Sequence, residues 1–140
     1  IHTANNTEGE EVLADLARRR GEGLVFANLV DFDQQYGHRN DPAGFARALE
    51  QFDERLGEIL GHLRDDEMCM VTADHGNDPT TPSTDHSREY VPLLVAGRRV
   101  RAGVDLGTRE TFADVAATLA EMFGVTAPVV GTSFLRGVRA

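Results

Sequence analysis

Histidine and aspartate side chains that could bind a metal ion gather in three short polar segments. Residues 31–38 (DFDQQYGH) and 74–78 (DHGND) each follow directly on an apolar run, and residues 84–87 (TDHS) lead toward a third one. Three of the five histidines lie in these segments, together with several aspartates. Mixed imidazole and carboxylate ligands suit Mn²⁺ or Zn²⁺ better than Ca²⁺. The pattern therefore favours a site for two divalent metal ions.

A simpler interpretation treats each histidine as a polar loop residue and each aspartate as a helix cap or turn former. For one Asp-His pair this simpler interpretation is the better one, whereas the convergence of three such segments favours the metal site. Asp31 and Asp33 cannot be separated by their spacing, because side chains two residues apart on an extended segment point the same way. Both therefore stay candidates on these grounds.

The apolar runs that precede or follow these segments are expected to be strands. Residues 24–30, 68–73 and 91–96 are continuously apolar rather than alternating, which is typical of strands covered on both faces. Because ligands gather at the carboxyl ends of such strands, the first two polar segments should lie at one edge of a parallel sheet.

Three helices are expected between and around these strands. A capping box at residues 7–10 opens the first, which ends in three arginines (residues 18–20) before Gly21. Asp41 and Pro42 open the second, whose apolar residues recur with a helical period through Leu63. The third runs over residues 111–123 and stops at Gly124. Strands alternating with helices predict an α/β fold.

Composition excludes several classes of function. The 140 residues suffice for one domain, and the net charge of −9 disfavours binding to nucleic acid or to an anionic membrane. All fourteen basic residues are arginine, which excludes mechanisms that need a lysine. A single cysteine and the lack of a long apolar stretch favour a cytoplasmic protein. Because the chain starts at Ile1 rather than at a methionine, we expect it to be the C-terminal piece of a longer protein.

Two segments resemble the phosphopentomutase family of the alkaline phosphatase superfamily: residues 30–39 and, more specifically, residues 72–93. Residues 2–9 (HTANNTEG) are similar to the segment that re-enters the core after that family's cap domain. The resemblance implies that residues 1–140 form the C-terminal part of a metal-binding catalytic core, without its N-terminal strands and cap domain. The implied fold is a partial alkaline-phosphatase-like α/β core, with a mostly parallel sheet sandwiched by helices.

The same resemblance implies how the site is built. Asp33, His38 and His86 would hold one Mn²⁺ ion, and Asp74 and His75 would hold a second. The remaining aspartate ligand and the phosphorylated threonine of that family are expected upstream of this chain, so no nucleophile is identified here. Candidates to accept a hydrogen bond from the second nitrogen of a metal-bound histidine are Asp31, Asp78 and Asp85.

By that resemblance the complete protein is an isomerase that interconverts ribose 1-phosphate and ribose 5-phosphate, and their 2-deoxy forms, with a sugar bisphosphate as primer. The isolated 140 residues are expected to be inactive. Two alternatives stay open. Another superfamily enzyme, such as a cofactor-independent phosphoglycerate mutase or a metal phosphatase, would share the Asp-His-Gly motif but not residues 78–90. A non-catalytic metal-binding module is the second alternative, because no nucleophile is identified.

Overall fold

The computed structural model describes residues 1–19 and 21–140; Arg20, which the sequence places in the basic end of the first helix, lies outside the described residues. The chain divides into two compact units. The first comprises Ile1–Arg64 and Val71–Leu93, and the second comprises Asp65–Met70 and Leu94–Ala140. No helix in the described part is both long and apolar enough to cross a membrane.

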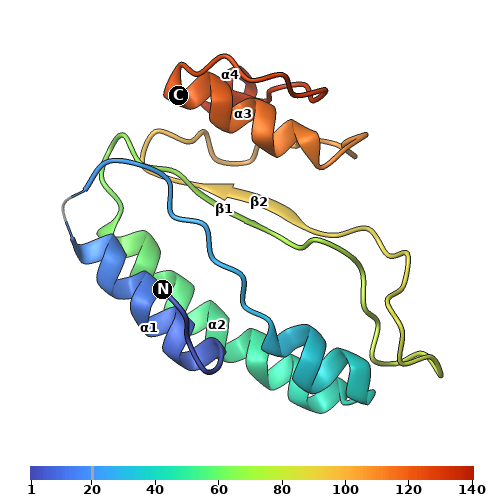
Figure 1. Ribbon diagram of the computed structural model, residues 1–140. Coiled ribbons are helices and arrows are strands. Elements are labelled where there is room, and N and C mark those ends of the chain that lie inside the picture. The colour runs from blue at the N-terminus through green and yellow to red at the C-terminus, as the bar shows by residue number, and fades with distance from the viewer. Residues whose placement is uncertain (20) are drawn as a thin grey trace. The chain divides into compact units, whose positions relative to one another are not determined.

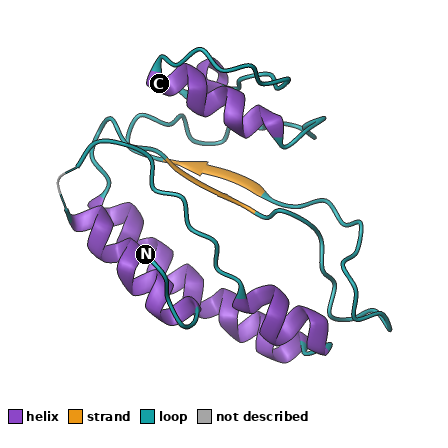
Figure 2. Ribbon diagram, viewed as in Figure 1, coloured by secondary structure: helices purple, strands orange, loops and turns teal. Residues whose placement is uncertain are grey.

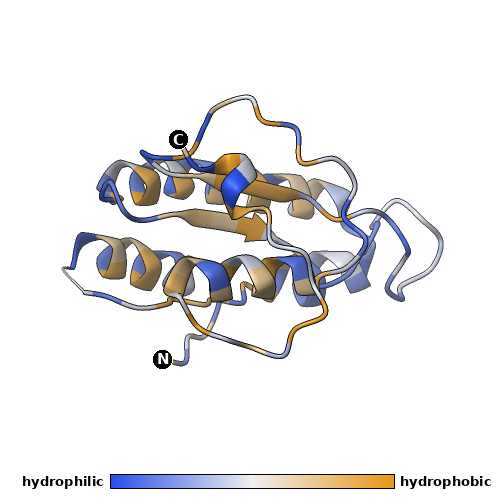
Figure 3. Ribbon diagram, turned by 90° about the horizontal axis from the view of Figure 1, so that it is seen from above, coloured by the Kyte–Doolittle hydropathy of each residue, from blue (hydrophilic) through white to orange (hydrophobic). Residues whose placement is uncertain are grey.

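Two helices of the first unit, α1 (Asn6–Arg18) and α2 (Pro42–His62), pack side by side (Figure 1). Ala14 of α1 and Ile59 of α2 are buried. The Gln51 amide donates a hydrogen bond to Thr7 Oγ1 at 2.9 Å, which links the two helices near the start of α1. Apolar and polar residues alternate around the helices, as expected of elements that are covered on one side only (Figure 3).

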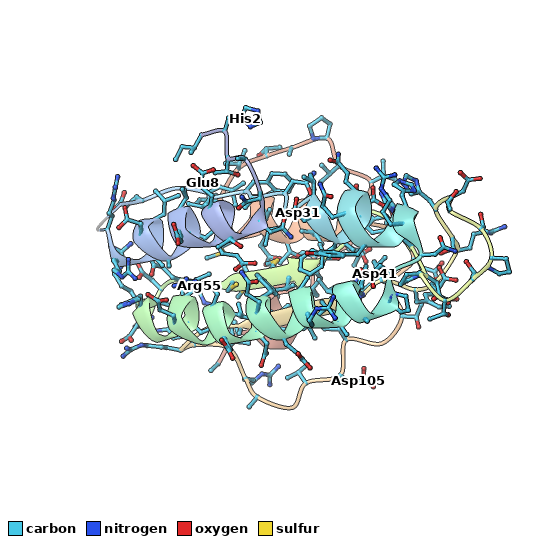
Figure 4. The ribbon with its side chains drawn as sticks, turned by 90° about the horizontal axis from the view of Figure 1, so that it is seen from below. His2, Glu8, Asp31, Asp41, Arg55 and Asp105 are labelled. Atoms are coloured by element: carbon cyan, nitrogen blue, oxygen red, sulfur yellow. The ribbon has the colours of Figure 1, made fainter. Side chains whose placement is uncertain are left out.

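The start of α2 confirms the sequence prediction. The Asp41 carboxylate accepts a hydrogen bond from the Gly44 N–H at 2.8 Å, and Pro42 occupies the first helical position. Proline is favoured there because its missing N–H would have no partner within the helix and its φ is already helical. Asp41 and the helix that it caps are visible in Figure 4.

The start of α1 differs from the prediction by two residues. Asn5, not Thr7, is the N-cap, and its side chain accepts a hydrogen bond from the Glu8 N–H at 2.9 Å. The Glu8 carboxylate in turn accepts one from the Ala4 N–H at 2.7 Å. A side-chain cap is present, as predicted, but on another residue. Asparagine accepts a hydrogen bond from the third N–H of a helix as well as threonine does, and Asn5 precedes Thr7 in the chain. The helix also ends earlier than expected, at Arg18.

The prediction of a strand at residues 24–30 is wrong, because the structure has a loop there. The segment is drawn as a loop in Figure 2, and Leu24, Val25 and Phe26 are exposed. A strand needs a neighbouring strand to bind its N–H and C=O groups, and the only sheet among residues 1–19 and 21–140 consists of two other strands. Apolar composition alone therefore does not make this segment a strand.

The segment that follows is more ordered than the polar loop that the sequence predicts. A π-helical turn, η1 (Phe32–Tyr36), runs into a 3₁₀ turn, η2 (Gly37–Arg39). The Phe32 ring packs against two rings of α2, with centroids 5.7 Å from Phe45 and 6.2 Å from Phe52. This aromatic contact anchors η1 on α2. It thereby fixes the backbone of Asp33, the next residue along the chain.

Strands β1 (Cys69–Thr72) and β2 (Leu93–Ala96) pair in a two-stranded sheet, and the boundary between the two units falls within both strands. Both were expected, although each is shorter than its apolar run and mostly half-buried rather than buried. The larger, mostly parallel sheet sandwiched by helices is not confirmed. What the structure contains is a partial α/β arrangement of helices and this small sheet.

The second unit contains α3 (Ala113–Phe123) and the short α4 (Leu135–Val138). The helix α3 begins two residues later than predicted and ends, as predicted, before Gly124, whose φ of 63° is left-handed. Glycine adopts this conformation without a steric penalty, which is why it commonly follows the last helical residue. Phe134, Leu135 and Val138 are the buried apolar residues described in this unit.

Candidate metal centre

Asp33 lies at the centre of the histidine cluster of the first unit. Its Oδ2 is 3.1 Å from Nε2 of His38, and its Oδ1 is 3.5 Å from Nε2 of His86. These side chains come from η1, from η2 and from the loop that leads to β2. The structure thus brings together residues from two of the three polar segments around a single carboxylate.

The third segment contributes His75, which stacks on His86 with ring centroids 3.6 Å apart. His38 also lies beside His86, at 4.9 Å between centroids. One potential ligand atom each from Asp33, His75 and His86 lies within 4.8 Å of the other two. Atoms at this mutual separation are spaced as the ligands of one cation would be.

The second nitrogen of two of these histidines is occupied by backbone. Nδ1 of His38 is 2.5 Å from the Thr84 carbonyl oxygen, and Nδ1 of His75 is 3.3 Å from the Gly76 carbonyl oxygen. A carbonyl oxygen can only accept a hydrogen bond, so the Nδ1 atoms must donate. In the neutral ring, Nε2 then carries a free lone pair. These lone pairs point at carboxylate oxygens, those of Asp33 and, from His75, that of Asp74 at 3.6 Å.

This donor set fits a divalent cation. Neutral imidazole nitrogens and carboxylate oxygens that face one another repel, because both present lone pairs, unless a proton or a metal ion lies between them. The backbone carbonyls hold the histidines in the tautomer whose Nε2 can bind metal, which is how metal-binding histidines are commonly oriented. Mixed nitrogen and oxygen ligands are those preferred by Mn²⁺ and Zn²⁺.

A model of the metalloenzyme superfamily matches residues 2–127. The chain belongs to the metalloenzyme superfamily. It is also similar to curated phosphopentomutases, being 62% identical to that of Anaeromyxobacter sp. (strain K) over 138 residues, which are 99% of this chain and 35% of that protein. The phosphopentomutase of Kosmotoga olearia is 55% identical, over 99% of this chain and 36% of that protein.

The chain therefore spans about a third of the length of the curated relatives that it matches. The placement of the chain at the C-terminal end of such a protein stays a prediction. Its membership of the metalloenzyme superfamily agrees with the cluster of potential metal ligands Asp33, His75 and His86, since both indicate bound metal ions.

The candidate ligands of the two expected metal ions lie closer together than the resemblance implied. The expected first group was Asp33 with His38 and His86, and His75 was assigned to a second group with Asp74. The structure places His75 against His86 and near Asp33, so the two expected groups share one cluster. Asp74 lies at its margin, with 76% of its side chain exposed and its Oδ2 3.6 Å from Nε2 of His75. How the ligands divide between two ions stays a prediction.

Asp31 and Asp33, which the sequence cannot separate, have different partners in the structure. The Asp31 carboxylate accepts a hydrogen bond from the Asn6 N–H at 2.8 Å, and the Asn6 side chain accepts one from the Asp31 N–H at 3.0 Å. Asp31 thus ties the start of η1 to the first turn of α1 (Figure 4). Beside it is a polar cavity of about 30 Å³, room for about one water molecule. Asp33 is left to face the histidines.

At His38 and His75, the carboxylates expected to orient the histidines do not do so. Backbone carbonyls, not Asp31, Asp78 or Asp85, lie against the two Nδ1 atoms. Asp78 instead accepts hydrogen bonds from the hydroxyl and the N–H of Thr80, at 2.7 and 2.8 Å, and these bonds hold the pKa of its carboxyl below its ordinary range. The course of the loop brings the Thr84 and Gly76 carbonyls to the histidine rings, and residue types alone do not predict this course.

Asn77 is a residue of the site that the sequence analysis did not single out. Its side-chain amide donates a hydrogen bond to Asp33 Oδ1 at 2.6 Å. The signal that could have found it is its place next to His75 and Gly76 in the second polar segment, although an asparagine between a glycine and an aspartate is more commonly a turn residue.

Proposed function

We propose that this chain belongs to a phosphopentomutase, an isomerase that interconverts ribose 1-phosphate and ribose 5-phosphate and their 2-deoxy forms. The observation that carries the proposal is the cluster of potential metal ligands Asp33, His75 and His86, in a chain 53–62% identical to curated phosphopentomutases. A sugar phosphate is the proposed substrate and the cytoplasm the proposed location. The isomerase is favoured over a phosphoglycerate mutase because the similar proteins carry the phosphopentomutase name.

The proposed ligands are Asp33, His38 and His86 for one Mn²⁺ ion, and Asp74 and His75 for the other. When bound, the two ions would neutralise the charge of the phosphoryl group and place its attacking and leaving oxygens. The protein's own contribution is to present the ligands in the correct state. The Thr84 and Gly76 carbonyls accept hydrogen bonds from Nδ1 of His38 and His75, which leaves the lone pairs of both Nε2 atoms available to a metal ion.

Part of the proposed machinery lies outside these residues. The chain spans about a third of its relatives, and the phosphorylated threonine and one further aspartate ligand are assigned to the rest of the protein. The isolated 140 residues should therefore be inactive. Activity is a property to be tested on the complete protein.

The experiment is an assay of ribose 1-phosphate conversion by the complete protein, before and after removal of metal with excess chelator. We expect activity to vanish with chelator and to return best with Mn²⁺, compared with Zn²⁺, Mg²⁺ and Ca²⁺. A parallel assay with 3-phosphoglycerate is the matched control for a different superfamily reaction, and it should show no conversion. Full activity in chelator would contradict the proposed metal chemistry, and conversion of 3-phosphoglycerate alone would contradict the proposed substrate.

A further inference from the structure

We infer that Asn77 is a positioning residue that holds Asp33 in the orientation needed to bind metal, and that residue 37 is glycine because a side chain there would keep the Asn77 amide from reaching Asp33. The inference rests on the proposed metal-binding role of Asp33. It adds to that role a pair of residues, Asn77 and Gly37, which the ligand set does not include.

The hydrogen bond from Asn77 selects one oxygen of the carboxylate. Asn77 Nδ2 donates to Asp33 Oδ1 at 2.6 Å, while Oδ2 lies 3.1 Å from Nε2 of His38. A carboxylate held at one oxygen cannot rotate freely about its side-chain torsions. An amide suits this task because its NH₂ donates without carrying a charge that would repel a cation.

Gly37 makes room for this hydrogen bond. A Cβ atom at position 37 would lie 2.3 Å from Nδ2 of Asn77 and 2.6 Å from its Cγ, far inside van der Waals contact. The backbone of Gly37 has φ −58° and ψ −63°, which any residue adopts. Glycine is therefore not needed for its conformational freedom here, and the steric reason, close approach of the Asn77 amide, is the one that remains.

The backbone on both sides of Asn77 is held by Ser87, the neighbour of His86. The Ser87 N–H donates to the Gly76 carbonyl at 2.9 Å, and the Asp78 N–H donates to Ser87 Oγ at 2.9 Å. Asn77 is thus fixed to the segment that carries one histidine while its side chain fixes Asp33. This arrangement couples the η1–η2 segment to the loop of residues 76–87, so that ligands from both segments keep their mutual positions.

The test uses the complete protein stripped of metal, with two measurements on each variant: calorimetric titration with Mn²⁺ alone and thermal melting in chelator. Asn77→Ala should weaken Mn²⁺ binding about 10- to 100-fold, with the melting temperature in chelator changed by less than about 3 °C. Gly37→Ala should weaken binding in the same way, because the new methyl group displaces the amide. It also keeps the inference testable if Asn77→Ala folds poorly.

Two controls separate this role from general support of the loop. The double variant Gly37→Ala with Asn77→Ala should bind Mn²⁺ no more weakly than Asn77→Ala alone, because the added methyl group then meets no amide. Asn40→Gly removes another amide bond to the same loop, from Asn40 Nδ2 to the Thr81 carbonyl at 2.6 Å, at a position whose φ of 50° suits glycine. It should change Mn²⁺ affinity less than about threefold.

The outcomes separate this inference from the proposed function. Wild-type protein that binds Mn²⁺, with Asn77→Ala binding equally well, would overturn the positioning role alone. Additive losses in the double variant would overturn the explanation of Gly37. A loss of melting temperature in chelator that accompanies the loss of affinity would show a structural role instead. Wild-type protein that binds no Mn²⁺ would overturn the metal centre and the positioning role together.

Discussion

Two aspartates, one in each unit, show how differently a carboxylate can be surrounded. Asp114, at the start of α3, is 4% exposed and is matched by donors from the protein. Its Oδ1 accepts a hydrogen bond from the Thr132 N–H at 2.7 Å, and its Oδ2 accepts one from Arg109 Nε at 2.7 Å. Asp33, with 29% of its side chain exposed, meets one amide donor and two histidine nitrogens.

The difference lies in what the neighbours offer. Asp114 meets the N–H of Thr132 at one oxygen and Nε and Nη2 of the Arg109 cation at the other, so the carboxylate is satisfied within the fold. Around Asp33 the Nε2 atom of His38 presents a lone pair, because its Nδ1 already donates to backbone. A carboxylate with protein donors stabilises a fold, whereas one that faces lone pairs is suited to an external cation. The partners, not the aspartate itself, decide which role applies.

The largest effect should follow substitution of Asp33. Asp33→Ala in the complete protein should lower turnover roughly a thousandfold or more, because it removes the carboxylate at the centre of the cluster. Its melting temperature in chelator should stay near that of the wild type, because the side chain is part-exposed and its removal costs the one hydrogen bond from Asn77. The checks are the ribose 1-phosphate assay and thermal melting. Asp33→Asn, which keeps the shape without the charge, should lose nearly as much turnover; stability lost in proportion to activity would argue for a structural Asp33.

Asp114 should show the opposite behaviour. Asp114→Ala leaves Arg109 without its carboxylate and the Thr132 N–H without an acceptor, so the melting temperature should fall by roughly 5–10 °C. Mn²⁺ affinity of the folded protein should be unchanged. Asp105→Ala is the matched control, because Asp105 is an exposed aspartate of the same unit whose carboxylate accepts a hydrogen bond from the nearby Gly107 N–H. Equal melting temperatures for the two variants would contradict the structural role of Asp114.

The parts of this molecule that could be predicted from sequence are those governed by local rules. The start of α2 at Pro42 and the end of α3 before Gly124 depend on residues within one helical turn, and both are confirmed. The convergence of three polar segments was also predictable in outline, because each follows or precedes an apolar run.

The parts that could not be predicted depend on partners far away in the chain. Residues 24–30 read as a strand, but strand formation requires a neighbour that composition does not supply. Asp31 and Asp33 differ because Asn6 binds the former, whereas Asn77 and two histidines surround the latter. The reason for Gly37 likewise appears only when Asn77 is seen to approach it.

The pH dependence of stability should sharpen the contrast through Asp114. Its pKa is lowered from the ordinary value of 3.8 by the Thr132 N–H, with Arg109 adding to the effect. In this pH range the unfolded chain therefore binds more protons than the folded one, so the stability from Asp114 is present above pH 3.8 and lost as pH falls through its lower folded pKa. Urea unfolding of wild type and Asp114→Asn should show a constant difference from pH 7 to about pH 5 that shrinks below it. A difference that grows on acidification would contradict this sign.

The smallest effect is expected at Asp78, which tests whether membership of the second polar segment is enough to make a carboxylate part of the metal centre. Asp78 lies three residues from His75, yet its carboxylate binds the hydroxyl and N–H of Thr80 rather than a histidine. Because its Oδ1 already accepts both Thr80 hydrogen bonds and so ties the carboxylate into its own turn, Asp78→Ala should change Mn²⁺ affinity less than about threefold, while the loop loses a local turn contact. Calorimetric titration of the metal-free complete protein measures this, with Asp33→Ala as the positive control. A loss of affinity above tenfold would mean that a carboxylate held by protein donors in its own turn still supports the ions, so that the partners of a carboxylate would not decide whether it serves the fold or the metal.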